Sequence, residues 1–375
     1  MQTSIYLLFS FLITLVTSAP IAEPEPEPKP EPESESIEIL KRHNDNILID
    51  PFTLSNQDLF DEIKRISEFS GAAYCISTIH GVKPGQLNEA CSDISCADAE
   101  KDIYVVDVVD SLSHALIMTE NSTKQIIIAF QGSSTFMDWV LDFTALPVDF
   151  ESYGSTKNLD VYSIDAEADD PKVHMGFKKA SENFFNHSLT ALQQLKAKYP
   201  DYQFVVTGHS LGGALASLVG VELYMMGYNP AIVSLAGPKV FSKTFANWVD
   251  QKFATDSYVT SLQEQSVSTI NPGTYTRITH VGDIVPCVPL VEMGYKHAGS
   301  EFYIDESDFP QNMLNVTIRG QYHERYELET LGGLAKKAVT DLKGLLKDYI
   351  VVAPHLYYLI TMSTCSGLLQ LIGLA

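Results

Sequence analysis

Hydrophobic and polar positions follow the spacing of helices in some parts of the chain and of buried strands in others. Apolar side chains recur every three or four residues over 59–73, which predicts a helix. The apolar runs 115–118 and 125–130 flank the polar turn ENSTK, a pattern typical of a β-hairpin whose second strand is fully buried. The same patterns predict helices at 178–199, 211–226 and 245–253 and strands at 204–206, 231–235 and 275–280. This alternation predicts an α/β fold with a central, mostly parallel sheet flanked by helices in a single domain.

The beginning of the chain departs from that pattern. Residues 1–18 contain an apolar stretch that is followed by small residues, a pattern typical of a secretory signal peptide. We expect cleavage after Ser18. Residues 19–42 form an acidic, Glu/Pro-rich segment that cannot build a core. Its end at Lys41-Arg42 favours a pro-segment removed by proteolysis over an ordinary pair of surface charges. We therefore expect the folded domain to span residues 43–375.

The end of the chain, residues 349–375, is long and apolar enough to span a membrane. Pro354, His355 and the polar and small residues 363–367 interrupt this run, and no basic cluster flanks its outer end. These interruptions favour a globular segment over a membrane or lipid anchor.

Composition restricts the partners. A chain of 375 residues, 45 % of them hydrophobic, can bury one large core. Its formal net charge of −22 repels nucleic acid and strongly anionic membranes, so we expect neither as a partner.

The cysteines fit an oxidising compartment, and their odd number leaves one over. Cys91 and Cys96 are close enough for a small loop, Cys75 and Cys365 could join the two ends of the domain, and Cys287 would then remain a thiol, although spacing alone leaves other pairings open. In a secreted protein three asparagines could carry glycans, namely Asn121, Asn186 and Asn315. Asn121 is the best placed of these because it lies in the predicted hairpin turn.

The run QFVVTGHSLGG at 203–213 carries the strongest chemical signal. It places Ser210 on a sharp turn between a strand and a helix, where a serine is forced outward and can act as a nucleophile. Such a turn needs small residues two positions before and two after the serine, and Gly208 and Gly212 supply them. A serine hydroxyl also needs a base, usually a histidine held by a buried carboxylate, and in α/β hydrolases the order is serine, acid, histidine.

Asp283 fits the acid because it directly follows the strand predicted at 275–280. Asp305, within a short strand pattern, and Asp308, in a polar loop, are the alternatives. For the histidine we favour His355, which follows Pro354 in a break of the apolar run, over His297. The remaining candidates are His323, in a charged run typical of a surface, and His209, which is better placed to support the site than to react.

Acyl transfer also needs donors for the developing oxyanion. The N–H of Leu211, directly after the nucleophile, is one candidate, and the loop FQGS at 130–133, at the end of a predicted strand, is the other. The next stretch has the apolar face of an amphipathic helix, formed by Phe136, Trp139, Val140 and Phe143. This helix could simply face the core, but its position beside the oxyanion loop suits a mobile lid over an apolar acyl pocket.

Together these residues resemble the fungal secreted class 3 lipases, the family of the extracellular triacylglycerol lipases of filamentous fungi and yeasts. The similarity runs from about residue 60 to 365 through FQGSS (130–134), VHMGF (173–177), VTGHSLGGA (206–214), FANWVD (245–250), TRITHVGDIVPCVP (276–289) and PHLYYLITMSTC (354–365). The chain departs from the family pattern at Gln131, where an arginine is usual, at Cys287 and in the tail after Cys365.

The resemblance implies an α/β-hydrolase fold and a role for each matched residue. Ser210 would be the nucleophile, Asp283 the acid and His355 the base, with Ser133 and Leu211 as the oxyanion hole. The segment 134–143 would be the lid, and the disulfides would join Cys75 to Cys365 and Cys91 to Cys96.

We therefore expect a secreted, extracellular lipase that hydrolyses fatty-acid esters of glycerol through an acyl-enzyme. It needs neither a metal nor an organic cofactor, meets the lipid–water interface through its lid, and has no stable protein partner. A soluble carboxylesterase, such as a feruloyl esterase on the same fold, is the first alternative. A catalytically inactive secreted binding protein is the second.

Overall fold

The computed structural model describes residues 50–76, 82–87, 102–132, 146–157, 170–320 and 353–362, all within one compact unit, Ile49–Ala375. The predicted signal peptide, pro-segment and lid lie outside these residues. The strands are β1 (Phe52–Thr53), β2 (Gly85–Gln86), β3 (Ile103–Val109), β4 (Ala115–Glu120), β5 (Gln125–Phe130), β6 (Pro147–Asp149), β7 (Lys172–His174), β8 (Gln203–His209), β9 (Ala231–Leu235), β10 (Phe241–Ser242), β11 (Tyr275–His280), β12 (Tyr295–Lys296), β13 (Ser300–Ile304) and β14 (Val316–Gly320). The helices are α3 (Gln57–Ala72), α6 (Tyr153–Thr156), α7 (Met175–Lys198), α8 (Leu211–Met225), α9 (Lys243–Lys252), α10 (Thr255–Gln263) and α12 (Ala353–Leu356).

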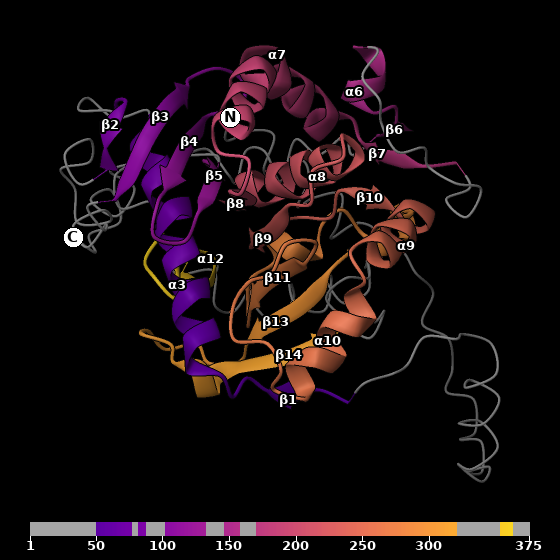
Figure 1. Ribbon diagram of the computed structural model, residues 1–375. Helices are drawn as coiled ribbons and strands as arrows, with labels where there is room; N and C mark the ends of the chain where they lie inside the picture. Colours follow the sequence, from indigo (N-terminus) through magenta and orange to yellow (C-terminus); the bar gives the residue numbers. More distant parts are fainter. Residues whose placement is uncertain are drawn as a thin grey trace, which may run out of the picture. The chain divides into compact units, whose positions relative to one another are not determined.

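Within the described residues, one large sheet has the strand order β1-β14-β13-β11-β9-β8-β5-β4-β3-β2 (Figure 1). Its middle strands, β5, β8, β9, β11 and β13, run parallel to their neighbours in this group. The strands on either side of this group are antiparallel to their neighbours. Between β3 and β4 and between β4 and β5 the reason is a short turn, which can only reverse the chain. The carboxyl ends of the parallel strands lie side by side along one border of the sheet, where α/β proteins usually bind their ligands.

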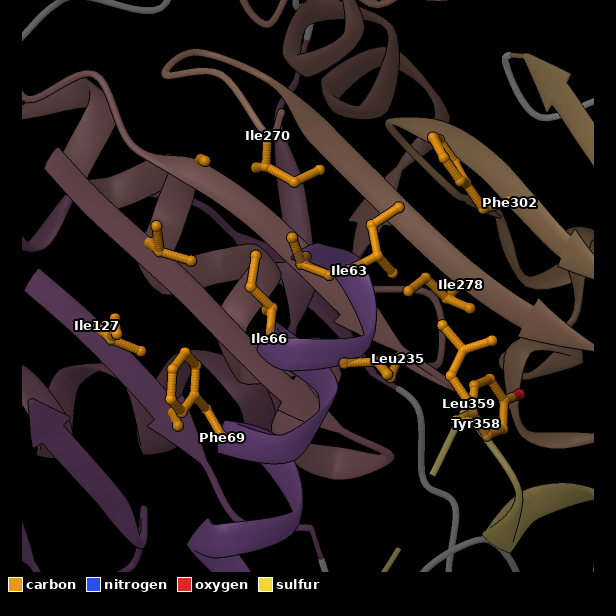
Figure 2. Packing of buried hydrophobic residues seen from close by; sticks show 14 of the residues in the cluster. Ile63, Ile66, Phe69, Ile127, Leu235, Ile270, Ile278, Phe302, Tyr358 and Leu359 are labelled. Carbon is orange, nitrogen blue, oxygen red and sulfur yellow. The ribbon is translucent and has the colours of Figure 1, made fainter. Parts of the chain in front are cut away.

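Helices cover both faces of this sheet. Along β5, Ile127 and Ala129 belong to the core beneath α3, whereas Ile126, Ile128 and Phe130 belong to the core shared with α7, α8 and α9. Figure 2 shows the α3 side, where Ile63, Ile66 and Phe69 point toward the sheet and Tyr358 and Leu359 join the same cluster. The chain's last described segment is therefore part of the main core.

The predicted α/β fold, with a parallel sheet between helices, is confirmed. The helices and strands predicted within the described residues are all present, with ends that differ by a few residues. For example, α7 begins at Met175 instead of residue 178, because the His174 side chain caps it by accepting the N–H of Gly176.

Several elements escaped the sequence pattern. These are β3, β14 and α10, the edge strands β1 and β2, and a small antiparallel sheet of order β12-β10-β7-β6. Strands of two or three residues are too short to show a period, and β3 mixes buried and exposed positions. Asp305 lies just after β13, not within a strand, because β13 ends at Ile304.

Over the described residues, no helix combines the length and the apolar character that crossing a membrane requires.

Candidate active site

Ser210 lies on the turn between β8 and α8 in a strained backbone conformation, with φ 60° and ψ −126°. The turn is possible because its glycines have no Cβ. At Gly208 a Cβ would lie 2.3 Å from the carbonyl oxygen of Gly212, and at Gly212 it would lie 2.4 Å from that of Phe130. The small residues predicted around the serine are therefore required by backbone contacts between β5, β8 and α8.

The Ser210 side chain lies inside the protein, with the residue only 1 % exposed. Its Oγ makes no hydrogen bond to any of the described residues, while its N–H donates to the Leu235 carbonyl at the end of β9 (2.9 Å). Leu211 is the first residue of α8, so its N–H is among those that a helix leaves without an intrahelical acceptor. A reacting group bound at Ser210 would meet this helix terminus.

Asp283 and His355, separated by a long stretch of chain, meet beside the serine turn. Asp283 lies in the turn after β11 and His355 in the short helix α12. His355 Nδ1 is 2.9 Å from Asp283 Oδ2, and the aspartate side chain is 0 % exposed. The His355 ring is 4.6 Å from that of His209, the residue before Ser210. The structure thus gathers the predicted serine, acid and histidine at one edge of the sheet.

The carboxylate of Asp283 accepts two further hydrogen bonds. The Tyr358 hydroxyl donates to Oδ2 (2.5 Å) and the Val285 N–H donates to Oδ1 (2.9 Å). Burial by itself raises the pKa of Asp283, but the charge of His355 and these hydrogen bonds outweigh it and hold the pKa below its usual value. Asp283 is therefore ionised at neutral pH and can stabilise a positive imidazole at His355.

His209 is held as a neutral ring by two partners. Its Nε2 lies 2.8 Å from the His355 carbonyl oxygen, which can only accept, so Nε2 carries the proton. Its Nδ1 then accepts from the Tyr74 hydroxyl (2.7 Å). Burial, followed by the charge of His355, holds the pKa of His209 well below its usual value. His209 thus holds the segment that carries His355 through a hydrogen bond, a supporting role that its position next to Ser210 predicted.

The rival histidine of the sequence, His297, points to a different partner. Its Nε2 donates to the Pro286 carbonyl oxygen (2.7 Å), and burial, with the charges of Arg277 and Lys239, holds its pKa well below the usual value. Lys239, which is 0 % exposed, donates to the Cys287 carbonyl oxygen (2.8 Å). His297 and Lys239 therefore brace the turn that follows Asp283.

The alternative acids are also elsewhere: Asp305 and Asp308 are exposed, and Asp305 accepts from the Thr317 hydroxyl (2.9 Å). The fourth candidate histidine, His323, lies outside the described residues.

The loop after β5 is described only as far as Gly132. A Cβ there would lie 2.1 Å from the Tyr74 hydroxyl oxygen and 2.7 Å from the His209 carbonyl oxygen, so only glycine fits. The Gly132 amide also donates to the Tyr74 hydroxyl. The other predicted residues of this region, Ser133 of the oxyanion hole and Phe136, Trp139, Val140 and Phe143 of the lid, lie outside the described residues.

Cysteine chemistry around the site is partly described. Cys75, next to Tyr74, is in a disulfide bond. Cys287 is buried and outside any disulfide, with its Sγ 3.8 Å from the Asp283 carbonyl oxygen. Cys91, Cys96 and Cys365 lie outside the described residues. No cluster of histidine, cysteine, aspartate and glutamate suited to a metal ion occurs in the part of the chain that the structure describes.

The sequence reasoning missed three residues that contact this site: Tyr74, Tyr358 and Lys239. Tyr358 had a local signal, since a residue three positions after His355 can share its side of a turn. Tyr74 and Lys239 had none, because their partners are distant in the sequence.

Comparison with known proteins agrees with a hydrolase site that has a serine, a histidine and an aspartate. Residues 127–293 match the family model described as lipase (class 3). The protein LIH1 of Saccharomyces cerevisiae, named as a candidate lipase, is 32 % identical over 259 residues, which cover 68 % of this chain and 76 % of that protein. A lipase of Rhizomucor miehei is 30 % identical over 256 residues, which cover 66 % of this chain and 59 % of its own length.

Solved structures share the fold. The Lip2 lipase of Yarrowia lipolytica matches with a TM-score of 0.63 and 26 % identity over 84 % of this chain and 98 % of its own. The mono- and diacylglycerol lipase of Aspergillus oryzae matches with a TM-score of 0.61 and 26 % identity over 83 % and 99 %. The expected α/β-hydrolase fold is confirmed. This chain is an ester hydrolase, and it belongs to the class 3 lipase family.

Proposed function

We propose that this protein hydrolyses the ester bonds between fatty acids and glycerol, with Ser210 as nucleophile, His355 as general base and Asp283 as the acid that orients it. One observation supports the assignment above the others. The fully buried, ionised carboxylate of Asp283 lies 2.9 Å from His355 Nδ1. Nearby, Ser210 has the strained backbone that a nucleophilic serine adopts on a turn between a strand and a helix. The relatives' names, which include triacylglycerol and mono- and diacylglycerol lipases, favour acylglycerols as substrates.

In this mechanism Ser210 Oγ attacks the ester carbonyl carbon while Nε2 of His355 takes the hydroxyl proton. The C–O bond to the glycerol breaks, and the leaving oxygen receives that proton from the imidazolium. Water, deprotonated by the same Nε2, then attacks the acyl-enzyme, the serine leaves with the proton, and the fatty acid is released. Asp283 keeps His355 Nδ1 protonated and stabilises the imidazolium in both steps. Ser210 Oγ and the imidazole need to close on each other when substrate binds, as is common for catalytic pairs in unliganded proteins.

The oxyanion of each tetrahedral intermediate would be held by the Leu211 N–H, at the start of α8, and by Ser133. Gly132, which directly precedes Ser133 in the chain, packs against the Tyr74 hydroxyl and the His209 carbonyl oxygen. Losing one such donor typically costs about 3–4 kcal/mol of transition-state stabilisation.

Labelling decides whether Ser210 is the nucleophile. A phosphonate ester should modify the wild-type protein at Ser210 and leave folded Ser210→Ala unmodified. Absence of labelling in well-folded wild-type protein would favour the inactive binding protein instead.

A lipid–water interface is the proposed site of action, reached through the lid residues Phe136, Trp139, Val140 and Phe143. Leu146, shortly after this segment in the sequence, is an exposed apolar side chain, 56 % accessible. The alternative is a soluble carboxylesterase. Hydrolysis of a chain-length series of triglycerides, by protein cut after Arg42, separates the two: a lipase accelerates when its substrate passes from dissolved to emulsified form, whereas equal rates on short soluble or aromatic esters favour the esterase.

We also propose a secreted protein, with residues 1–18 as signal peptide, 19–42 as pro-segment and 43–375 as catalytic domain. Relatives named as secreted mono- and diacylglycerol lipases support this. The disulfides would be Cys75–Cys365 and Cys91–Cys96, and the first would hold the His355 segment in the fold. Of the sequon residues Asn121, Asn186 and Asn315, the first lies exposed in the β4–β5 turn, whereas Asn186 lies within α7. Peptide mapping of secreted protein without reduction, before and after removal of N-glycans, tests these assignments.

A further inference from the structure

Gln311, in the loop between β13 and β14, makes three hydrogen bonds although it has no part in the chemistry above. Its Oε1 accepts the Leu359 N–H (3.2 Å), and its Nε2 donates to the Tyr357 carbonyl oxygen (3.4 Å) and to Nε2 of His280 (3.1 Å). The residue is 6 % exposed. Within the same loop, the ring of Phe309 stacks on that of Tyr357 at 5.1 Å.

The main-chain partners determine the protonation of His280. A backbone N–H can only donate and a carbonyl oxygen can only accept, so the amide of Gln311 has one possible orientation. Its NH₂ group therefore faces His280, and Nε2 of that ring must be an acceptor. The other nitrogen, Nδ1, then carries the proton and donates to the Val281 carbonyl oxygen (2.7 Å). This state is neutral, in agreement with burial, which lowers the pKa of His280.

His280 belongs to the segment that carries Asp283, because its carbonyl oxygen accepts the Asp283 N–H (3.1 Å). The amide of Gln311 thus contacts His280 in the segment that carries Asp283. It also contacts the backbone of Tyr357 and Leu359, the two residues that flank Tyr358. These are the two segments whose relative position sets the 2.9 Å contact between Asp283 and His355.

The turn held by Gln311 starts directly after the His355 helix. The Tyr358 N–H donates to the Ile360 carbonyl oxygen (3.0 Å), and Leu359 has φ 65°, a strained value for a leucine. Figure 2 shows the side chains of Tyr358 and Leu359 inside the core beneath α3. A side chain that accepts the N–H of the strained residue stabilises this turn, since an unpaired buried N–H is costly.

We propose that Gln311 is a positioning residue of the ester-hydrolysing site: it clamps the turn after His355 to the segment that carries Asp283. The proposal rests on the proposed function. It predicts that the clamp affects the rate of the chemical steps and not the binding of small esters, because Gln311 touches neither the nucleophile nor the oxyanion donors.

The first test replaces Gln311 by methionine, which has similar length and no hydrogen-bonding group, in the full chain. The matched control is Gln193→Met, the same change on the exposed side of α7. On a soluble p-nitrophenyl ester, at a temperature where all proteins are folded, we expect Gln311→Met to lower kcat about tenfold to a hundredfold, as a shift of about 1 Å in a catalytic group does. KM should stay within about twofold of the wild-type value, since bonds to the substrate are unchanged. A folded Gln311→Met protein with the kcat of the control would overturn the proposal.

The second test uses Gln311→Glu and the pH dependence of its kcat relative to wild type. At acid pH a proton on the new carboxyl group or on His280 restores a donor between them, whereas at higher pH a carboxylate faces the lone pair of the ring and the Tyr357 carbonyl. The groups that bear on His280 are Asp283 and Glu306 by their charges, Tyr358 by its ring at 5.8 Å, and the Val281 carbonyl. We expect the ratio of variant to wild-type kcat to fall from about pH 5 to about pH 8, the range in which histidines titrate. A merely structural role gives a constant ratio, and this result refutes the clamp even if the methionine variant is unstable.

The wild-type protein separates this proposal from the proposed function. If wild type is labelled at Ser210 and hydrolyses the ester while both Gln311 variants behave like their controls, the clamp is wrong and the function stands. If wild type is neither labelled nor active, the proposed function fails first.

Discussion

Replacing Tyr358 by phenylalanine tests the electrostatics of the buried carboxylate at the centre of the site. Tyr358 is 0 % exposed, and its hydroxyl donates to Asp283 Oδ2 at 2.5 Å. Phenylalanine keeps the ring in the core and removes only the donor. The Asp283 carboxylate then retains the bonds from His355 and the Val285 N–H.

A hydrogen bond to a charged group contributes about 1.5–3 kcal/mol. Loss of this one should therefore destabilise the folded protein by about that amount at neutral pH and raise the pKa of Asp283, because the Tyr358 hydroxyl is one of the groups that lower it. The other change expected is small: kcat should fall far less than in Asp283→Asn, because the bond that sets the tautomer of His355 remains. The corresponding aspartate-to-asparagine change in a serine protease lowers kcat by roughly 10⁴.

The effect on stability should depend on pH, with a sign that follows from the direction of the shift. Burial raises the pKa of Asp283, but the charge of His355 and the three hydrogen bonds lower it further, to below its usual value of 3.8. A carboxyl group whose pKa is lowered on folding stabilises the protein above the unfolded pKa, and this contribution is lost as the pH falls through the folded pKa. The difference between wild type and Tyr358→Phe should thus be full at about pH 7 and shrink below about pH 4.

Urea unfolding of both proteins at several pH values, with kcat on a soluble ester, measures these effects. The reasoning is refuted if the two proteins are equally stable at about pH 7, or if the difference in stability between them does not shrink as the pH is lowered below about 4 and the folded carboxyl group is protonated.

Three further changes probe other parts of the structure. Tyr74→Phe leaves His209 Nδ1 without its donor and the Gly132 amide without its acceptor, so kcat/KM on a soluble ester should fall about tenfold, the equivalent of one hydrogen bond; unchanged kinetics would show that this contact does not align the site. Burial raises the pKa of Glu222 from 4.5 to about 7, although Ser152 and the Tyr153 N–H donate hydrogen bonds to it. As the pH rises between these two values, the stability of the wild-type protein should therefore fall by ~3 kcal/mol relative to that of Glu222→Gln. Parallel stability–pH curves for the two proteins would contradict this. Cys75→Ala removes a disulfide bond and should lower the free energy of unfolding by about 2–5 kcal/mol, measured by urea unfolding without reductant; an unchanged midpoint would mean that the bond adds nothing to the folded state.

The sequence by itself determined the elements and the chemistry of the nucleophile. Apolar periodicity predicted β5, β8, β9 and β11 and the helices between them, because residues on one face of a helix or strand recur at a fixed local spacing. Ser210 was predicted on the same ground, since the glycines that its turn needs are its near neighbours in the chain. Asp283 followed from its place directly after a strand.

Tertiary structure decided what the spacing left open. Sequence allowed both His297 and His355 as partner of Asp283, and the fold directs His297 to the Pro286 carbonyl and His355 to the carboxylate. It also revealed the contacts of Tyr74, Tyr358 and Gln311, whose partners come from other strands and loops. Local periodicity reports which face of an element is buried, whereas a hydrogen bond between distant residues depends on how loops meet at the edge of the sheet, and no single segment carries that information.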